Sequence, residues 1–251
     1  TLNKEKEKKI LFYHIHHPDN YALLNFVRTN PNARWLMMVR EPIQSCESWC
    51  REPFILNNYN KIVSQIISML LDINSVIFEE SDSIGVRLED LKNNSRATIS
   101  SLCKWLDIRE EKSLYEMTAQ GEKWWGDPSS PDYRKNIMTA FGKSSIRRKL
   151  GSVFSESDQF ILATLFYPFS VKFNYEKRNT SRFNSNLNRI RPMMNQMFDF
   201  ERKIAKEKNI DDRKFMKSGP YFYFRSVLIN RWNYLKKYQT YHNMLEPLKI
   251  E

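Results

Sequence analysis

An arginine and a serine stand eight residues apart at the point where an apolar stretch of the sequence meets a proline. Arg34–Val39 is a continuous apolar run bounded by turn residues, which predicts a strand buried on both faces of a parallel sheet. Arg40 would end this strand, and Ser48 would lie on the helix that Pro42 can open. Ligands of open parallel sheets bind at this edge. A guanidinium, a hydroxyl and the N–H groups of a helix N-terminus favour an anion there, most naturally phosphate. An unrelated surface arginine and serine would give the same spacing.

Thiols are the other group whose spacing could do chemistry, because Cys46 and Cys50 are four residues apart on the same predicted helix. Two thiols without a matching histidine or a further nearby cysteine make a poor metal site. Buried apolar thiols are the favoured interpretation. With Cys103 the chain has three cysteines, and an odd number favours a reducing compartment, weakly a cytoplasmic one.

The elements that must position these residues alternate between strand and helix, which predicts an α/β fold with a parallel sheet covered on both sides. We expect strands at 10–13, Arg34–Val39 and Ile84–Leu88. We expect a helix at Asn20–Arg28, with Tyr21, Leu24 and Val27 or Arg28 at helical spacing. Further helices are expected at Pro42–Cys50, at Asn57–Ile73, from a Ser95 cap to Trp105, and at Ser155–Phe169. The irregular stretch Gly121–Gly142 is typical of a binding loop.

Charge divides the chain into two parts. The net charge is +11, and residues 176–251 hold 17 Lys/Arg against 8 Asp/Glu, a net +9. Asn179–Asn188 is expected to be a linker, followed by helices near Met193–Lys208 and Tyr221–Tyr241. We therefore predict a domain over 1–175 and a basic, mainly helical extension over 176–251. Such an extension could bind nucleic acid, anionic lipid or anionic glycan, or could simply be a solvated helical surface.

Three segments in register resemble the PAPS-dependent sulfotransferases. Pro31-Asn-Ala-Arg34, Arg40-Glu-Pro42 and Ser48-Trp49 are similar to the segment of that family that binds the 3′-phosphate of the donor. Val86-Arg-Leu-Glu-Asp-Leu91, followed by a helix ending in Trp-Leu-Asp-Ile, resembles a second family segment, with Leu88 in place of the usual tyrosine. Trp124-Trp-Gly-Asp and the stretch Arg147–Ser155 resemble the basic loop near the family's C-terminus, with its glycine pattern half present. The resemblance covers about residues 10–175 and leaves out the tail.

The resemblance implies a three-layer α/β/α fold like that of P-loop kinases, and sulfuryl transfer from PAPS to an acceptor hydroxyl. Arg40 and Ser48 would bind the 3′-phosphate of PAPS, which serves as co-substrate without a metal. Arg147, Arg148 and Lys149 would add cation or backbone contacts to the same phosphate, since clustered cations bind a dianion better than one does.

One part of the family pattern is missing. The loop that cradles the 5′-phosphosulfate needs glycine for close backbone approach, and the first glycine of this chain is Gly85. We expect either that the sequence is a fragment lacking this loop or that transfer chemistry has been lost, and we favour the fragment. In some branches the general base is a histidine ahead of the arginine strand, which makes His16 and His17 candidates. The alternative places the base in the missing portion. Metal binding by His14, His16 and His17 is a weaker hypothesis.

The acceptor is expected to carry a hydroxyl and is suggested to be a glycan. Trp124 and Trp125 could stack on a sugar ring or close over the adenine of the donor. Core packing of the loop is an equal alternative. Glu89 and Asp90 are expected at a helix N-terminus. Two rival functions remain: an anion-binding module without transfer activity, and, less favoured, a nucleic-acid binder using the tail. No membrane span is expected, and the oligomeric state is left open.

Overall fold

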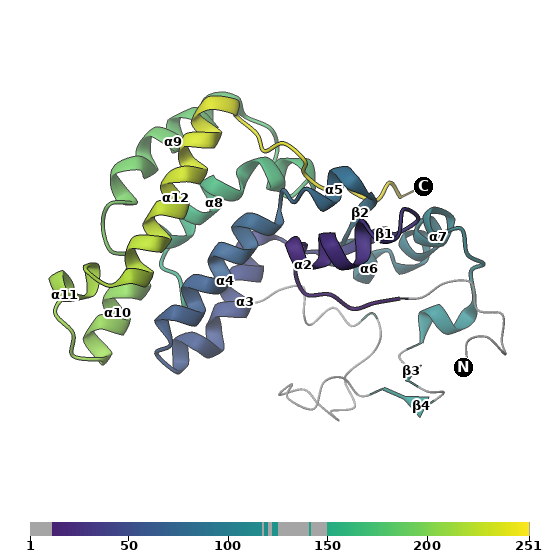
Figure 1. Ribbon diagram of the computed structural model, residues 1–251, viewed down its shortest axis with the longest axis horizontal. Helices are drawn as coiled ribbons and strands as arrows, with labels where there is room; N and C mark the ends of the chain where they lie inside the picture. Colours follow the sequence, from purple (N-terminus) through teal and green to yellow (C-terminus); the bar gives the residue numbers. More distant parts are fainter. Residues whose placement is uncertain (1–11, 117, 120–121, 125–140, 142–149, 251) are drawn as a thin grey trace.

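The computed structural model describes residues 12–116, 118–119, 122–124, 141 and 150–250. Over these residues the fold is α/β, with mostly helices and a parallel sheet of two strands (Figure 1). The parallel pairing confirms the expected strand direction. Of the first predicted strand, 10–13, the structure describes only residues 12 and 13, and neither lies in a strand. Most of the predicted loop 121–142 lies outside the described residues.

The sheet pairs β1 (Arg34–Val39) with β2 (Asp82–Arg87), in a register that sets Arg34 opposite Asp82 and Val39 opposite Arg87. The chain's last residues run along β2, where Gly85 N–H donates to the Glu246 carbonyl at 2.7 Å. The expectation that β1 is buried on both faces is wrong. Val39 is its one fully buried residue, and Met38 is 46% exposed. The described residues supply β1 with one partner strand and too little cover for both of its faces.

The chain enters the sheet through a short helix that changes its winding. The predicted helix Asn20–Arg28 is an α-turn, α2 (Asn20–Ala22), followed by a π-helix, η1 (Leu23–Val27). Of the predicted stripe, Val27 is buried, whereas Tyr21 and Leu24 are 65% and 54% exposed. Ala22 and Leu23 are buried instead, because these residues and Val27 pack with Ile77.

Two antiparallel helices, α3 (Pro42–Ile55) and α4 (Tyr59–Asp72), and the short α5 (Ile77–Glu80) connect β1 to β2. The predicted stripe on α4 is confirmed, because Ile62, Ile66 and Leu70 are fully buried. By length and composition alone the stretch Tyr59–Glu80 could cross a membrane, but 39% of its most apolar window is buried in the fold. A core helix passes the same test, so the finding is consistent with the expectation of no membrane span.

After β2 come α6 (Leu88–Asn93), α7 (Ser95–Leu106), the 3-10 turn η2 (Lys112–Tyr115) and the antiparallel strands β3 (Thr118–Ala119) and β4 (Glu122–Lys123). The prediction that Ser95 caps α7 is wrong. Ser95 is the first residue of this helix, and Asn94 precedes it. Ile99 and Cys103 are buried on this helix, as its spacing predicts.

The remaining chain is helical: α8 (Glu156–Lys172), α9 (Thr180–Met193), α10 (Asp199–Glu207), α11 (Asp212–Met216) and α12 (Gly219–Tyr238). The predicted linker Asn179–Asn188 is wrong. Asn179 caps α9 by accepting from Arg182 N–H, and Phe183, Leu187 and Ile190 form its buried stripe. Polar composition hid a helix whose apolar positions recur every three or four residues.

One hydrophobic core crosses residue 175. It contains Ile66 of α4, Phe166 of α8, Phe200 of α10 and Phe224 of α12. Figure 1 shows α9 and α12 lying along α8, with α10 and α11 at the end of the molecule far from the sheet. The basic tail therefore completes the core around α3, α4 and α8.

Candidate functional site at the carboxyl edge of the sheet

Arg40 leaves the carboxyl end of β1 and lies along α3. Its Nη2 donates to Gln44 Oε1 at 2.8 Å, one helical turn into α3. Gln44 and Ser48 are four residues apart, so their side chains project from the same face of the helix. Arg40, which is half-buried, is therefore hydrogen-bonded to a residue on the helix face that also carries Ser48.

The N–H groups at the start of α3, expected to join the anion site, are already used. Glu41 accepts from Ile43 N–H at 3.1 Å and from Gln44 N–H at 2.7 Å. Burial raises the pKa of Glu41, and these two hydrogen bonds oppose the rise. That part of the expectation is wrong, because the chain supplies its own carboxylate cap where a ligand was expected.

A second cation, which the motifs did not identify, reaches the same edge. Lys92 lies on α6, the helix that follows β2. Burial lowers the pKa of Lys92, and the charge of Arg40 lowers it further. Lys92 and Arg40 are both half-buried and act on each other electrostatically, and Arg40 also acts on the Glu41 carboxylate, whose pKa rise it opposes. The sequence signal that could have identified Lys92 is its position shortly after β2, the strand that pairs with β1.

The carboxylates at this edge have donors in the fold. Glu89 accepts from the Tyr175 hydroxyl at 2.9 Å, and burial followed by the Glu89 charge raises the pKa of that tyrosine. Asp90 pairs with Arg87 at 3.6 Å, and the Arg87 guanidinium lies 4.6 Å from the Tyr175 ring centre. Glu89 and Asp90 stand in the first turn of α6, as predicted. The geometry gives them structural partners.

The predicted basic triplet Arg147, Arg148 and Lys149 lies outside the described residues, but the chain just after it is fixed on α3. Glu47, 3% exposed, accepts from the Ser152 hydroxyl at 2.6 Å, from Val153 N–H at 2.7 Å and from Phe154 N–H at 3.2 Å. Glu47 directly precedes Ser48. The segment that follows the triplet is therefore held against the helix that carries Ser48.

The two histidine candidates differ in their surroundings. His16 is exposed, and its ring lies 4.7 Å from that of His14. His17 is half-buried and makes a 2.8 Å hydrogen bond from Nδ1 to Asp72 Oδ2, at the end of α4. Its ring also meets the Trp49 indole edge-on, with centroids 6.0 Å apart. His17 therefore contacts α3 at Trp49, the residue that follows Ser48.

The cysteines are buried free thiols, as expected. Burial raises the pKa of Cys50 to about 12 and that of Cys46 well above its ordinary value. Among the described residues no group of three or more His, Cys, Asp and Glu side chains could hold a metal ion.

No protein-family model, curated protein or solved structure matches this chain. Its function has to be argued from its own geometry.

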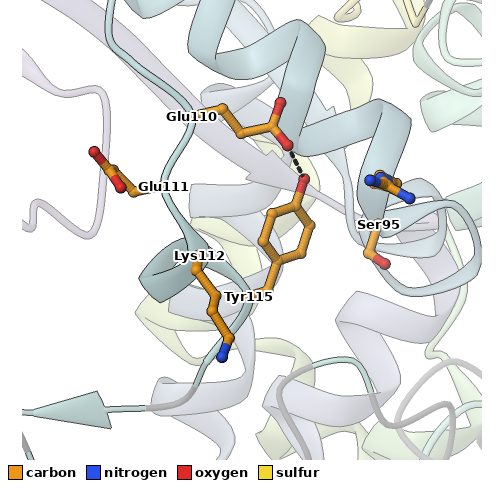
Figure 2. A pocket seen from close by; sticks show the side chains of 6 residues that line it. Ser95, Glu110, Glu111, Lys112 and Tyr115 are labelled. Carbon is orange, nitrogen blue, oxygen red and sulfur yellow. Dashed lines mark hydrogen bonds between the residues drawn. The ribbon is translucent and has the colours of Figure 1, made fainter.

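A hollow of about 440 Å³ on the described surface lies elsewhere, between the start of α7 and η2. Figure 2 shows Tyr115 turned toward Glu110, to which it donates at 2.6 Å. Neither Arg40 nor His17 lines this hollow. Its lining residues are mostly exposed: Ser95, Arg96, Glu110, Glu111, Lys112 and Tyr115. An open hollow lined by solvated side chains makes a poor catalytic site. Trp124 is half-exposed, and Trp125 lies outside the described residues.

Proposed function

We propose that this chain is part of a PAPS-dependent sulfotransferase with a three-layer α/β/α fold, and that the edge formed by Arg40, Ser48 and Lys92 binds the donor's 3′-phosphate. The observation that carries the proposal is that Arg40, at the end of β1, hydrogen-bonds to Gln44 on the face of α3 that carries Ser48, with Lys92 on the helix that follows the neighbouring parallel strand. A terminal phosphate is a dianion at neutral pH, and two fixed cations suit it better than one.

Ser48 would add a hydroxyl donor from the same face of α3 as Gln44, the partner of Arg40. Arg147, Arg148 and Lys149 would approach from the segment anchored through Ser152 to Glu47. The anchor supports this assignment, because it ties the chain three residues after Lys149 to the helix position beside Ser48.

The reaction joins the acceptor oxygen to sulfur and breaks the bond between sulfur and the oxygen of the donor's 5′-phosphate. The electrons of that bond leave with adenosine 3′,5′-bisphosphate, and the acceptor's proton passes to a general base, for which His16 and His17 are the candidates. The acceptor is a hydroxyl compound, proposed to be a glycan. Binding at the 3′-phosphate would orient the donor at a distance from the reacting sulfur.

The test is binding of adenosine 3′,5′-bisphosphate to the full-length protein. Binding is measured by the shift of the thermal unfolding midpoint and by calorimetry. The parent should be stabilised, and Arg40→Ala should bind roughly 10- to 100-fold more weakly, the effect of losing a charged hydrogen bond. Its midpoint without ligand should stay close to that of the parent.

Arg51→Ala is the matched control, because it removes the same charge from an exposed position on the same helix. Adenosine 5′-monophosphate, which lacks the 3′-phosphate, should stabilise neither protein. Equal binding by the parent and Arg40→Ala would overturn the assignment. Oligonucleotide binding that falls steeply with salt, without any response to the bisphosphate, would replace it with a nucleic-acid function.

A further inference from the structure

A histidine–carboxylate pair joins the chain before β1 to the end of α4. The His17 Nδ1 atom and the Asp72 Oδ2 atom are 2.8 Å apart, and the two side chains are 34% and 15% exposed. An ionised carboxylate only accepts hydrogen bonds, so the proton between them must sit on the imidazole. In the neutral ring this places the hydrogen on Nδ1 and leaves the lone pair on Nε2.

The pair is held on several sides. The Trp49 indole contacts the His17 ring edge-on. The next residue, Pro18, is buried, and its carbonyl accepts from the Ser75 hydroxyl at 2.6 Å, just beyond α4. Burial raises the pKa of Asp72, and the hydrogen bond from His17 opposes the rise. Both ends of the pair are therefore fixed in position by residues that take no part in it.

The pair also contacts α3, the helix that carries Ser48. From His17, α2 and η1 run to Arg28, which pairs with Glu80 two residues before β2 begins. Its contact with Trp49 sets His17 beside the helix that carries Ser48.

We propose that His17, rather than His16, is the general base, and that Asp72 is its positioning residue. Asp72 holds the proton on Nδ1 so that Nε2 can accept the proton of the acceptor hydroxyl while oxygen bonds to sulfur. It also stabilises the imidazolium that results. This inference rests on the proposed function, but the tautomer it requires can be tested by itself.

Nitrogen-15 NMR of histidine-labelled full-length protein, at a pH where the rings are neutral, reports the tautomer. His17, assigned from the signal lost in His17→Gln, should carry its proton on Nδ1. Asp72→Ala should move it toward Nε2, the tautomer expected of a ring without such a partner. Asp19→Ala is the control, because this carboxylate caps α2 only two residues from His17. A parent His17 protonated on Nε2, or an equal change in Asp19→Ala, would overturn the proposal.

Rates of sulfuryl transfer from PAPS to phenols of graded acidity distinguish a positioning role of Asp72 from a purely structural role. His17→Gln should lower kcat roughly 10²- to 10⁴-fold and Asp72→Ala at least 10-fold, with the largest losses for the least acidic phenols, which most need a base. His242→Gln, which removes an exposed histidine beyond α12, should behave like the parent, and a loss in His16→Gln as large as that in His17→Gln would overturn the choice between the two. Losses that are equal for every phenol would make the role structural. The bisphosphate should bind Asp72→Ala and the parent alike, so failure of the phosphate site would appear separately.

Discussion

Glu47 shows what a buried carboxylate requires at the scale of one residue. It is almost fully buried, and three donors from residues 152–154 replace the water it has lost. Two of these donors are backbone N–H groups with no freedom to turn elsewhere. Truncation of Glu47 would leave them unsatisfied, which costs more than the hydrogen bonds themselves contribute.

We therefore expect Glu47→Ala to lower the free energy of unfolding by about 2–4 kcal/mol in urea denaturation. It should also weaken binding of adenosine 3′,5′-bisphosphate, because the segment after the basic triplet loses its anchor. Glu52→Ala, at an exposed position on the same helix, should stay within about 0.5 kcal/mol of the parent. A Glu47→Ala protein as stable as Glu52→Ala would show that these hydrogen bonds do not hold the segment.

Residue types identified Arg40, Ser48 and the histidines, but not the residues that complete their surroundings. Lys92 and Asp72 stand on helices far along the chain, and neither belongs to a motif. Each becomes relevant only because of a neighbour that the fold provides: the charge of Arg40 for Lys92, and the His17 ring for Asp72.

At the scale of elements, Gly85 lets β2 lie between α8 and the end of the chain. A Cβ atom at this position would lie 2.6 Å from the Phe173 ring and 2.9 Å from Leu245. The Gly85 backbone also bonds to Glu246 and Leu248. The strand, the end of α8 and the C-terminal segment can therefore meet only if this residue has no side chain.

Gly85→Ala should lower the free energy of unfolding by about 1–3 kcal/mol, because Phe173 is fully buried and has no room to turn away. The matched change Gly219→Ala, at the first position of α12 with no atom near the new Cβ, should leave stability unchanged or slightly higher. Chemical denaturation of both variants provides the comparison. Equal stability of the two would mean that the contact among these three segments is loose.

At the scale of the whole molecule, a buried polar cluster joins the tail to α4. Glu201 of α10 accepts from the Tyr59 hydroxyl at 2.6 Å and pairs with Arg225 of α12, whose guanidinium lies 4.2 Å from the Tyr221 ring centre. Burial raises the pKa of Glu201, and the Arg225 charge opposes the rise. Part of the tail's positive charge is thus used inside the core, which favours a structural role for those cations.

Arg225→Met should lower the free energy of unfolding by about 3–5 kcal/mol at neutral pH, because it leaves a buried carboxylate without its cation. The folded-state pKa of Glu201 then lies still higher above the unfolded value near 4.5. A group of this kind stabilises the fold below its unfolded pKa and loses that contribution as pH rises through its folded pKa. Part of the lost stability should therefore return as pH falls from 7 toward 4.5.

Thermal unfolding across this pH range measures the effect. Arg202→Met, which breaks an exposed pair with Asp199, should change stability by less than about 1 kcal/mol and show no such recovery. A loss in Arg225→Met that does not depend on pH would place its origin in lost packing against Tyr221 and its neighbours.

The sequence alone determined the elements with strong local signals: the stripe of α4, the position of the helix α8, the parallel direction of β1 and β2, and the placement of Arg40 at a strand end. The spacing of apolar residues and the starts of helices at proline depend on residues only a few positions apart, so the sequence alone shows them. The π-turn at Leu23–Val27, the helix hidden in Asn179–Asn188 and the exposure of β1 depended on which surfaces the rest of the chain covers.

Only the tertiary structure decided which charged groups meet. It placed Lys92 on the helix that follows the strand next to that of Arg40, and it paired Asp72 with His17 and Glu47 with the segment after the basic triplet. It also gave the N–H groups at the start of α3 to Glu41, where the sequence suggested a ligand. Electrostatic interactions and hydrogen bonds depend on distance in space, and the order of residues along the chain does not contain that distance.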